Sequence, residues 1–184
     1  MINVRKRLLD AAERLAYRKG IHATGVDAVL TEAGAAKMSL YNHFGSKEGL
    51  LLAMLDRRHE MWMAWFESRT RALAPAAGGL IPGMFRALAE WFSNPEFNGC
   101  LFVNAAAEHR KASHPIRRLA ESHKQDLARL VARFADEAGA ASPPPAMLMV
   151  LIDGAISVAL VSRRADVAET AEAAARRLMG ADSD

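Results

Sequence analysis

The sequence predicts an all-α protein of about nine helices arranged in two helical domains. Apolar residues recur at helical spacing along almost the whole chain, strand-like alternation is hard to find, and glycine and proline separate the periodic stretches. Hydrophobic residues make up 51% of the 184 residues, which is enough for a substantial core and excludes a disordered chain. We therefore expect a folded, helical protein.

The first two predicted helices are bounded by glycines. An apolar stripe over residues 4–15 forms the first helix, and Gly20 ends it as a C-terminal cap. Thr24 is predicted to cap the second helix, with Asp27 three residues later as in the acidic form of the capping box. Gly34, which has no Cβ atom, lets the chain turn sharply at the end of this helix.

A third short helix is predicted over residues 37–43, and longer helices follow it. Ser46 is expected to cap a long fourth helix, which Pro75 and the pair Gly78-Gly79 end. The remaining helices are predicted over residues 81–92, 99–110, 114–138, 146–163 and 166–179.

Positive charge is concentrated at the N-terminal end. Residues 1–50 contain eight Lys/Arg and five Asp/Glu, whereas residues 51–184 contain sixteen of each, so the whole net charge of +3 lies in the first part. Because Lys and Arg displace counterions from phosphates, this bias favours a polyanionic partner.

We place the domain boundary near residue 47, with a helix-turn-helix domain over residues 1–47 and a second helical domain over residues 48–184.

Cysteine usage and hydropathy exclude several classes of protein. Cys100 is the only cysteine, so neither an intramolecular disulfide nor a multi-cysteine metal site can form, and a cytoplasmic location is expected. The N-terminal residues lack the apolar segment of a signal peptide. The apolar stretch 146–162 is shorter than the roughly 20 residues of a membrane span and is interrupted by Asp153, which predicts a buried helix and no membrane contact.

Catalytic and metal-binding patterns are missing from the sequence. The histidines at positions 59, 109, 114 and 123 have no paired-ligand spacing and are expected at the surface or in caps. No glycine-flanked serine presents a nucleophile, as it would in a hydrolase. We expect no enzyme, no metal site and no cofactor.

The first domain has two short helices joined through a glycine turn, with a supporting helix before them and a long helix after. This order of helices is the one that places a recognition helix in the major groove of DNA. Lys37 and Lys47 can reach phosphates, while Leu40 and Phe44 can anchor the helix inward. Phosphates or base edges can be bonded by Ser39, Tyr41, Asn42 and His43. Bundles that do not bind DNA share this packing, so the pattern alone leaves that alternative open.

The amino-acid sequence of this region is more specific than its order of helices. Residues 24–34 read TGVDAVLTEAG and residues 37–51 read KMSLYNHFGSKEGLL. These segments closely resemble the TetR family of bacterial repressors, over about the first 52 residues. The resemblance implies a homodimer that binds a palindromic operator and is released when a small molecule enters the C-terminal domain. Carried over by position, it implies phosphate contacts by Thr24, Lys37, Tyr41, His43 and Lys47, and base contacts by Met38, Ser39 and Asn42.

Two positions depart from the pattern of that family. Ala35-Ala36 stand where the family commonly has Val-Ser, so the recognition helix lacks its serine N-cap, a loss of about 1 kcal/mol of local stability. Met38 replaces a small residue at a base-facing position. Beyond residue 52 the resemblance is confined to helicity, with one exception, the segment Asn98–Asn104 followed by Glu108.

Aromatic side chains of the second domain are candidates for an effector cavity, because ligand pockets are mostly apolar. The competing interpretation is that aromatics at helical spacing are plain core. Asn104 either bonds to the backbone or faces a ligand. Cys100 is either an electrophile or oxidant sensor, as in some proteins that the chain resembles, or an inert buried thiol. The predicted effector-binding residues are Trp62, Trp65, Phe66, Phe85, Leu88, Phe92, Cys100, Val103, Asn104 and Ala107.

A dimer interface is predicted on the helices over residues 114–138 and 146–163. The first carries an apolar stripe, and the second is apolar almost all round. Small residues in the second permit close backbone approach, and the resembling family uses the corresponding pair of helices in a two-fold contact. Asp153 would need a partner such as a serine or arginine across the interface. The predicted interface residues are Leu127, Leu130, Phe134, Leu151, Gly154, Ala155 and Val158.

Taken together, these features predict a ligand-responsive transcriptional regulator, most simply a repressor. Its expected partners are double-stranded operator DNA, a second copy of the chain and an apolar or aromatic small molecule. The alternative is a helical ligand-binding or scaffolding module that does not bind DNA. The sequence does not distinguish repression from activation.

Overall fold

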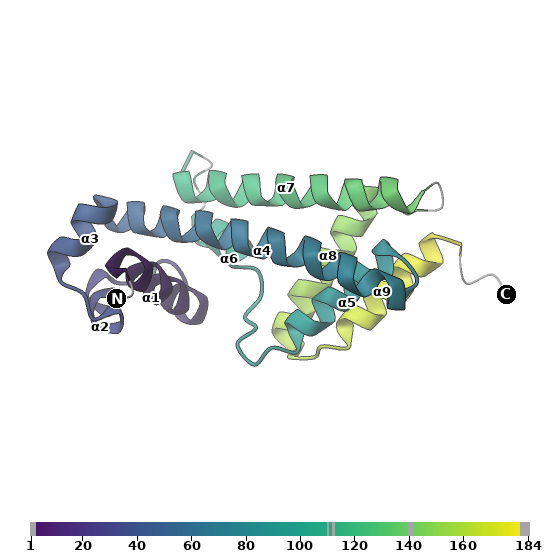
Figure 1. Cartoon of the computed structure of the whole chain (residues 1–184), viewed down its shortest axis with the longest axis horizontal. Helices are drawn as coiled ribbons and strands as arrows, with labels where there is room; N and C mark the ends of the chain where they lie inside the picture. The colour runs from purple at the N-terminus through teal and green to yellow at the C-terminus, as the bar shows by residue number, and fades with distance from the viewer. Residues whose placement is uncertain (1–2, 110, 112, 140–141, 181–184) are drawn as a thin grey trace. The chain divides into compact units, whose positions relative to one another are not determined.

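The computed structural model describes residues 3–109, 111, 113–139 and 142–180, and all regular secondary structure within them is helical (Figure 1). The prediction of an all-α fold is therefore confirmed. The helices are α1 (Val4–Lys19), α2 (Val26–Ala33), α3 (Lys37–Phe44), α4 (Lys47–Ala77), α5 (Leu80–Phe92), α6 (Leu101–Glu108), α7 (Pro115–Ala138), α8 (Pro145–Ser162) and α9 (Val167–Leu178).

The chain forms two compact units, each built from two segments. The first unit comprises Met1–Met61 and Leu101–His123, and the second comprises Trp62–Cys100 and Lys124–Asp184. The long helices α4 and α7 contribute residues to both units. The predicted domain boundary at residue 47 stays a prediction.

In the first unit, α2 and α3 pack against α1 (Figure 1). The apolar stripe of α1 is buried there, including Leu8, Ala11 and Leu15. Asn3 caps the start of α1 by accepting a hydrogen bond from the Arg5 backbone N–H at 2.9 Å. Gly20 ends the helix with a positive φ of 91°, as predicted.

The predicted cap of α2 is wrong. The helix begins after Gly25, which has extended backbone geometry and provides no side-chain cap. Thr24 instead donates its hydroxyl hydrogen bond to the Gly20 carbonyl at 2.8 Å, and only 1% of the residue is exposed. The hydroxyl thus closes the α1–α2 turn, because a buried donor needs a partner and the nearest free carbonyl lies one turn back.

The start of α4 is as the sequence predicts, but its end is not. Ser46 accepts a hydrogen bond from the Gly49 backbone N–H at 2.9 Å, which confirms the predicted N-cap. Pro75 was expected to end the helix, but it lies within the last turn, and α4 continues to Ala77 before the positive-φ glycines Gly78 and Gly79.

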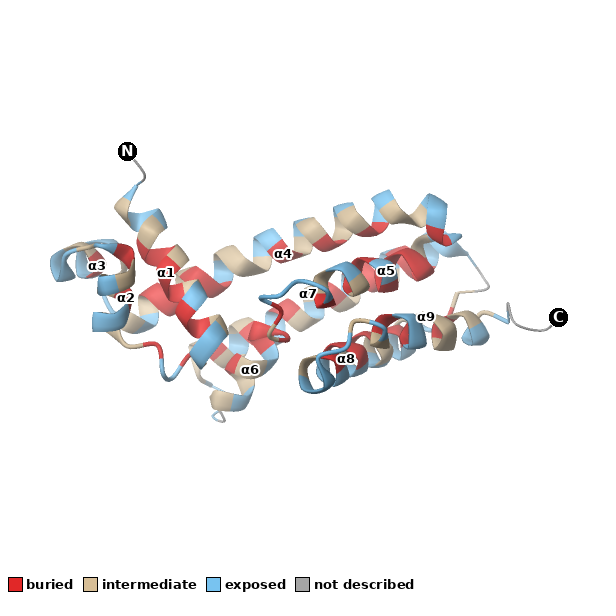
Figure 2. Ribbon diagram, turned by 90° about the horizontal axis from the view of Figure 1, so that it is seen from below, coloured by how far each residue is buried: buried red, intermediate tan, exposed pale blue. Residues whose placement is uncertain are grey.

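The second unit has its core where α5, α8 and α9 pack on one another. Figure 2 shows α5 as largely buried, in agreement with the buried Ile81, Met84 and Phe85. Gly83 permits close approach of α5 to α4, since a Cβ atom at this position would lie 2.9 Å from the Thr70 carbonyl oxygen. The second half of α7, which belongs to the same unit, also has buried apolar side chains.

Candidate nucleic-acid interface

The third helix, α3, has one buried face and one exposed face. Gly34 adopts a left-handed conformation at the end of α2, which reverses the chain toward α3. Leu40 is completely buried and attaches α3 to the rest of the first unit, with Phe44 half-buried at its end. The exposed residues are Lys37, Met38, Tyr41, Asn42 and His43. The structure therefore brings five of the predicted DNA-binding residues onto one exposed surface.

Two large side chains with apolar character are exposed on α3. Met38 is 69% exposed, and Tyr41 beside it is 41% exposed. Because these two side chains point outward, they contribute little to the packing of α3 within the chain. Such exposed apolar groups typically mark a contact surface.

The start of α3 lacks a side-chain cap, as the sequence predicted. Ala36 occupies the N-cap position with φ −75° and ψ 148°, and no side chain bonds to the free N–H groups of the first turn. The Ser39 backbone N–H bonds to the Ala36 carbonyl at 3.0 Å, and its side chain is half-buried.

Two predicted phosphate contacts lie outside α3. Lys47 begins α4 and donates from its ammonium group to the His22 carbonyl at 3.3 Å, so its side chain lies against the α1–α2 loop. Thr24 is buried and its hydroxyl is used within the loop, which leaves no exposed side-chain group for a phosphate. The predicted phosphate contact by the Thr24 side chain is therefore not supported by this structure.

Sequence reasoning missed one cation near α3. The Arg5 guanidinium carbon lies 5.5 Å from the centroid of the Phe44 ring. This contact holds a positive charge beside the end of α3. The basic N-terminal run was visible in the sequence, but its contact with α3 depends on how α1 packs.

Comparison with known proteins agrees with this geometry. The family model described as "Bacterial regulatory proteins, tetR family" matches residues 8–54, which cover most of α1, all of α2 and α3, and the start of α4. The crystal structure of SCO4454, a TetR-family transcriptional regulator from Streptomyces coelicolor, superposes with a TM-score of 0.82 at 32% identity, over 98% of this chain and 96% of that one. The chain belongs to the TetR family.

Relatives of this TetR-family protein match over different lengths. The transcriptional repressor ComR of Escherichia coli is 30% identical over 101 residues, or 54% of this chain and 48% of ComR. The transcriptional regulator LmrA of Bacillus subtilis is 24% identical over 164 residues, or 86% of this chain and 87% of LmrA. The chain thus spans about half the length of ComR and most of the length of LmrA.

The predicted effector-binding residues of this TetR-family protein are divided between the two units. Val103, Asn104 and Ala107 lie on α6 in the first unit, and the other predicted residues lie in the second. In the second unit the aromatic rings pack on one another: Trp62 stacks on Phe66 at 4.9 Å between centroids, and Trp91 meets Trp62 at 5.5 Å. Their role in effector binding stays a prediction.

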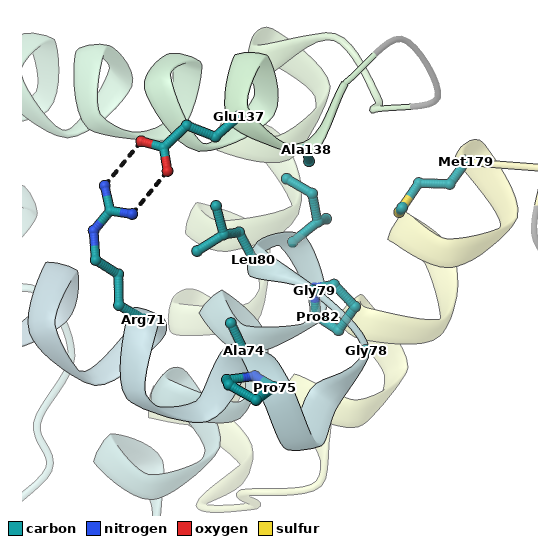
Figure 3. Close-up of a pocket in the computed structure, with 11 residues that line it drawn as sticks. Arg71, Ala74, Pro75, Gly78, Gly79, Leu80, Pro82, Glu137, Ala138 and Met179 are labelled. Atoms are coloured by element: carbon teal, nitrogen blue, oxygen red, sulfur yellow. Dashed lines mark hydrogen bonds and ion pairs between the residues drawn. The ribbon is translucent and has the colours of Figure 1, made fainter.

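The described part of the second unit has a surface pocket of about 540 Å³ (Figure 3). Arg71 bonds to both carboxylate oxygens of Glu137 at 2.7 and 2.8 Å on its rim, and this hydrogen bonding lowers the pKa of Glu137. The lining residues are Arg71, Ala74, Pro75, Gly78, Gly79, Leu80, Ile81, Pro82, Glu137, Ala138 and Met179. This pocket and the predicted effector-binding set have no residue in common.

The predicted dimer-interface residues stay a prediction, and they differ in burial. Four of their side chains are buried within the single chain: Leu127, Leu130, Phe134 and Ala155. They face inward because α7 and α8 each have a core side, which the sequence did not distinguish from an interface side. Gly154 and Val158 are exposed and Leu151 is half-buried.

The outer face of α8 carries an exposed apolar stripe. Val150 and Val161 are 73% and 83% exposed, and they are joined at helical spacing by Met147 and Val158. The helix Pro145–Ser162 is long and apolar enough to cross a bilayer by length and composition, with 28% of that window buried. An apolar stripe this continuous needs a cover in solution.

Asp153 finds its partner inside the chain. Its carboxylate forms an ion pair with Lys124 of α7, within the second unit. The predicted partner across a dimer interface is therefore not needed. Lys124 lies on the neighbouring helix, a proximity that the sequence did not reveal.

His123 departs from the predicted surface or capping position, whereas His109 lies at the end of α6 and Cys100 is buried, as one of its two interpretations expects. His123 is buried, and its Nδ1 lies 3.0 Å from Nδ1 of His59 within the first unit. His109 bonds to the Ala105 carbonyl at 2.8 Å. Among the described residues no group of three or more His, Cys, Asp or Glu is arranged to hold a metal ion. Cys100 is buried.

Proposed function

We propose that this TetR-family protein is a ligand-responsive transcriptional regulator, most simply a repressor, that binds a palindromic operator. The observation that carries the proposal is α3: a short helix fixed by the buried Leu40 that exposes Lys37, Tyr41 and their polar neighbours on one surface. Side chains of these types supply phosphate and base-edge contacts when such a helix enters the major groove.

A homodimer fits both the operator and the exposed stripe of α8. A palindromic operator presents two equal half-sites, so a two-fold dimer contacts both with the same surface. The exposed stripe consists of the apolar side chains Met147, Val150, Val158 and Val161. The same stripe on a second copy of the chain can therefore pack against it. Apart from the adjoining residues and the backbone of α8 itself, no described residue lies within 4 Å of a Cβ atom placed at Gly154, so this side of α8 is sterically open to a second helix. We place α8 at the centre of the dimer.

The effector is proposed to be an apolar or aromatic small molecule that acts within the cytoplasm. The aromatic residues around Trp62 and Phe66 support the apolar character, because ligand sites are mostly apolar with few polar groups. The effector releases DNA if it binds better to the form of the dimer whose α3 helices do not match adjacent half-sites.

The proposal is tested by binding of the purified protein to DNA upstream of its own gene across a salt series. We expect selective, salt-sensitive binding that the variant Lys37→Ala/Tyr41→Ala loses. Any residual binding by the variant should have a salt slope smaller by about two units, because the dimer loses one Lys37 phosphate contact in each half-site. The matched control is Arg129→Ala/Met61→Ala, which removes one exposed cation and one exposed apolar side chain elsewhere. Absence of selective binding by the wild-type protein would favour a helical ligand-binding module.

A further inference from the structure

The loop between α1 and α2 is held by a side chain from a distant part of the sequence. Glu108, the last residue of α6, accepts hydrogen bonds from two successive backbone N–H groups, Ile21 at 3.1 Å and His22 at 2.6 Å. Each carboxylate oxygen takes one of them. Successive N–H groups form a concave site that favours an anion. The loop therefore binds the carboxylate in the way that such sites bind a free anion.

The loop is also held by hydrogen bonds among its own residues. Gly20 donates to the Ala16 carbonyl at 2.9 Å and accepts from the Thr24 hydroxyl at 2.8 Å. The Thr24 backbone N–H bonds to the Ile21 carbonyl at 3.1 Å. Withdrawal of Glu108 would leave the backbone N–H groups of Ile21 and His22 without these partners.

The Glu108 carboxylate can approach the α1–α2 loop because residue 20 is a glycine. A Cβ atom at Gly20 would lie 2.8 Å from Oε1 of Glu108, and the φ of 91° is unfavourable for any residue with a side chain. Gly20 is therefore more than the end of α1: it leaves room for Glu108 to reach the loop.

The α1–α2 loop also contacts Lys47, one of the predicted phosphate-binding residues. The His22 carbonyl accepts from the ammonium group of Lys47 at 3.3 Å, and the N–H of the same residue donates to Glu108. Glu108 and Lys47 are consequently linked through one residue, all within the first unit. A change in the position of α6 can therefore reach Lys47 along this path.

We propose that Glu108 is a positioning residue that sets the α1–α2 loop, and through His22 the side chain of Lys47, for operator binding. This inference rests on the proposed function. Because Glu108 ends α6, which also carries the predicted effector residues Val103 and Asn104, a shift of that helix by the length of a hydrogen bond withdraws the carboxylate. The loop then loses its anchor and operator affinity falls.

The first measurement needs no DNA. Amide hydrogen exchange is followed by NMR in the full-length wild-type protein, Glu108→Gln, Glu108→Ala and the control Glu121→Ala, which alters an exposed carboxylate of α7. We expect exchange at Ile21 and His22 to rise about tenfold or more in Glu108→Ala, with Ala12 of α1 unchanged. Glu108→Gln keeps the size of the side chain but only one acceptor oxygen, so one of the two amides should stay protected. Unchanged exchange at both amides overturns the proposal.

The second measurement is operator affinity in a double-mutant cycle with Lys47→Ala. We expect Glu108→Ala to lower affinity by no more than Lys47→Ala does, and by less than about twofold when Lys47 is already removed. Additive losses would mean that Glu108 does not act through Lys47, which overturns the proposal. If the wild-type protein selects no DNA, the proposed function fails, and the role of Glu108 in DNA binding fails with it. The exchange experiment then still decides whether the carboxylate holds the loop.

Discussion

Thr24 has the residue type of a helix N-cap, yet its hydroxyl closes the turn before the helix. A threonine can bond to a free N–H ahead of it or to a carbonyl behind it, and both are local choices. Burial of the Thr24 side chain favours the second choice. Single residues at helix ends are therefore where local rules are most easily overridden.

Ala36, the N-cap residue of α3, allows a test of helix capping. Because it already has the extended backbone of an N-cap but no side-chain acceptor, Ala36→Ser should supply one to the first turn of α3. We expect the free energy of unfolding to rise by about 0.5–1 kcal/mol, measured by chemical denaturation. Ala35→Ser, one residue before the N-cap, is the matched control and should have little effect. A destabilised Ala36→Ser would contradict the assignment.

Met38 is the residue whose chemistry bears most directly on operator sequence. An exposed thioether side chain in the major groove favours the methyl group of thymine, which cytosine lacks. Single replacement of thymine by deoxyuridine in a selected operator removes this methyl alone. We expect one such replacement per half-site to weaken binding about threefold for the wild-type protein and not for Met38→Ala. Equal sensitivity of the two proteins would show that Met38 does not read a methyl group.

At the scale of elements, α1 and α4 are joined by an ion-pair network rather than by apolar contacts alone. Arg57 of α4 donates to Asp10 at 2.7 Å and to Glu13 at 2.8 Å, and Lys6 also reaches Asp10 at 2.8 Å. Partial burial raises the pKa of Asp10, but the hydrogen bonds from Lys6 and Arg57 lower it more. The net pKa therefore lies below the ordinary value of 3.8.

This network predicts a specific loss of stability in acid. Because the pKa of Asp10 is lower in the folded protein than in the unfolded chain, its contribution is present above pH 3.8 and is lost as the pH falls through the folded pKa. We expect Asp10→Asn to lower the free energy of unfolding at neutral pH by on the order of 1 kcal/mol. The difference from wild type should shrink in acid. Urea unfolding across pH, with the exposed Asp136→Asn as control, measures this. A difference that does not depend on pH would contradict it.

At the scale of the whole molecule, the proposed dimer contact through α8 predicts that dimerisation and DNA binding are lost together. Val150 is 73% exposed in the single chain, so Val150→Glu should leave the fold of one protomer intact. A charge buried against a second copy is strongly unfavourable, so the variant should be monomeric by analytical ultracentrifugation. The monomer should also lose most of its operator affinity because it contacts one half-site. Met61→Glu, at an exposed site of α4, should stay dimeric. A dimeric Val150→Glu would place the interface elsewhere.

The sequence by itself determined the elements and the candidate recognition surface. Helical periodicity located the helices, glycines located the ends of α1 and α2, and Leu40 against Lys37 and Tyr41 indicated which side of α3 faces inward. These features depend on contacts within a few residues, and the residue types involved have few alternatives. The missing cap at Ala36 was visible for the same reason.

Only the tertiary structure decided which apolar face is core and which is exposed. Leu127 and Phe134 of α7 have the same chemistry as Val150 and Val161 of α8, and only packing shows that the first two are buried. The links from Glu108 to the α1–α2 loop and from Lys124 to Asp153 join residues that are far apart in sequence. Such contacts are set by how helices pack in three dimensions, for which a single sequence has no local signal.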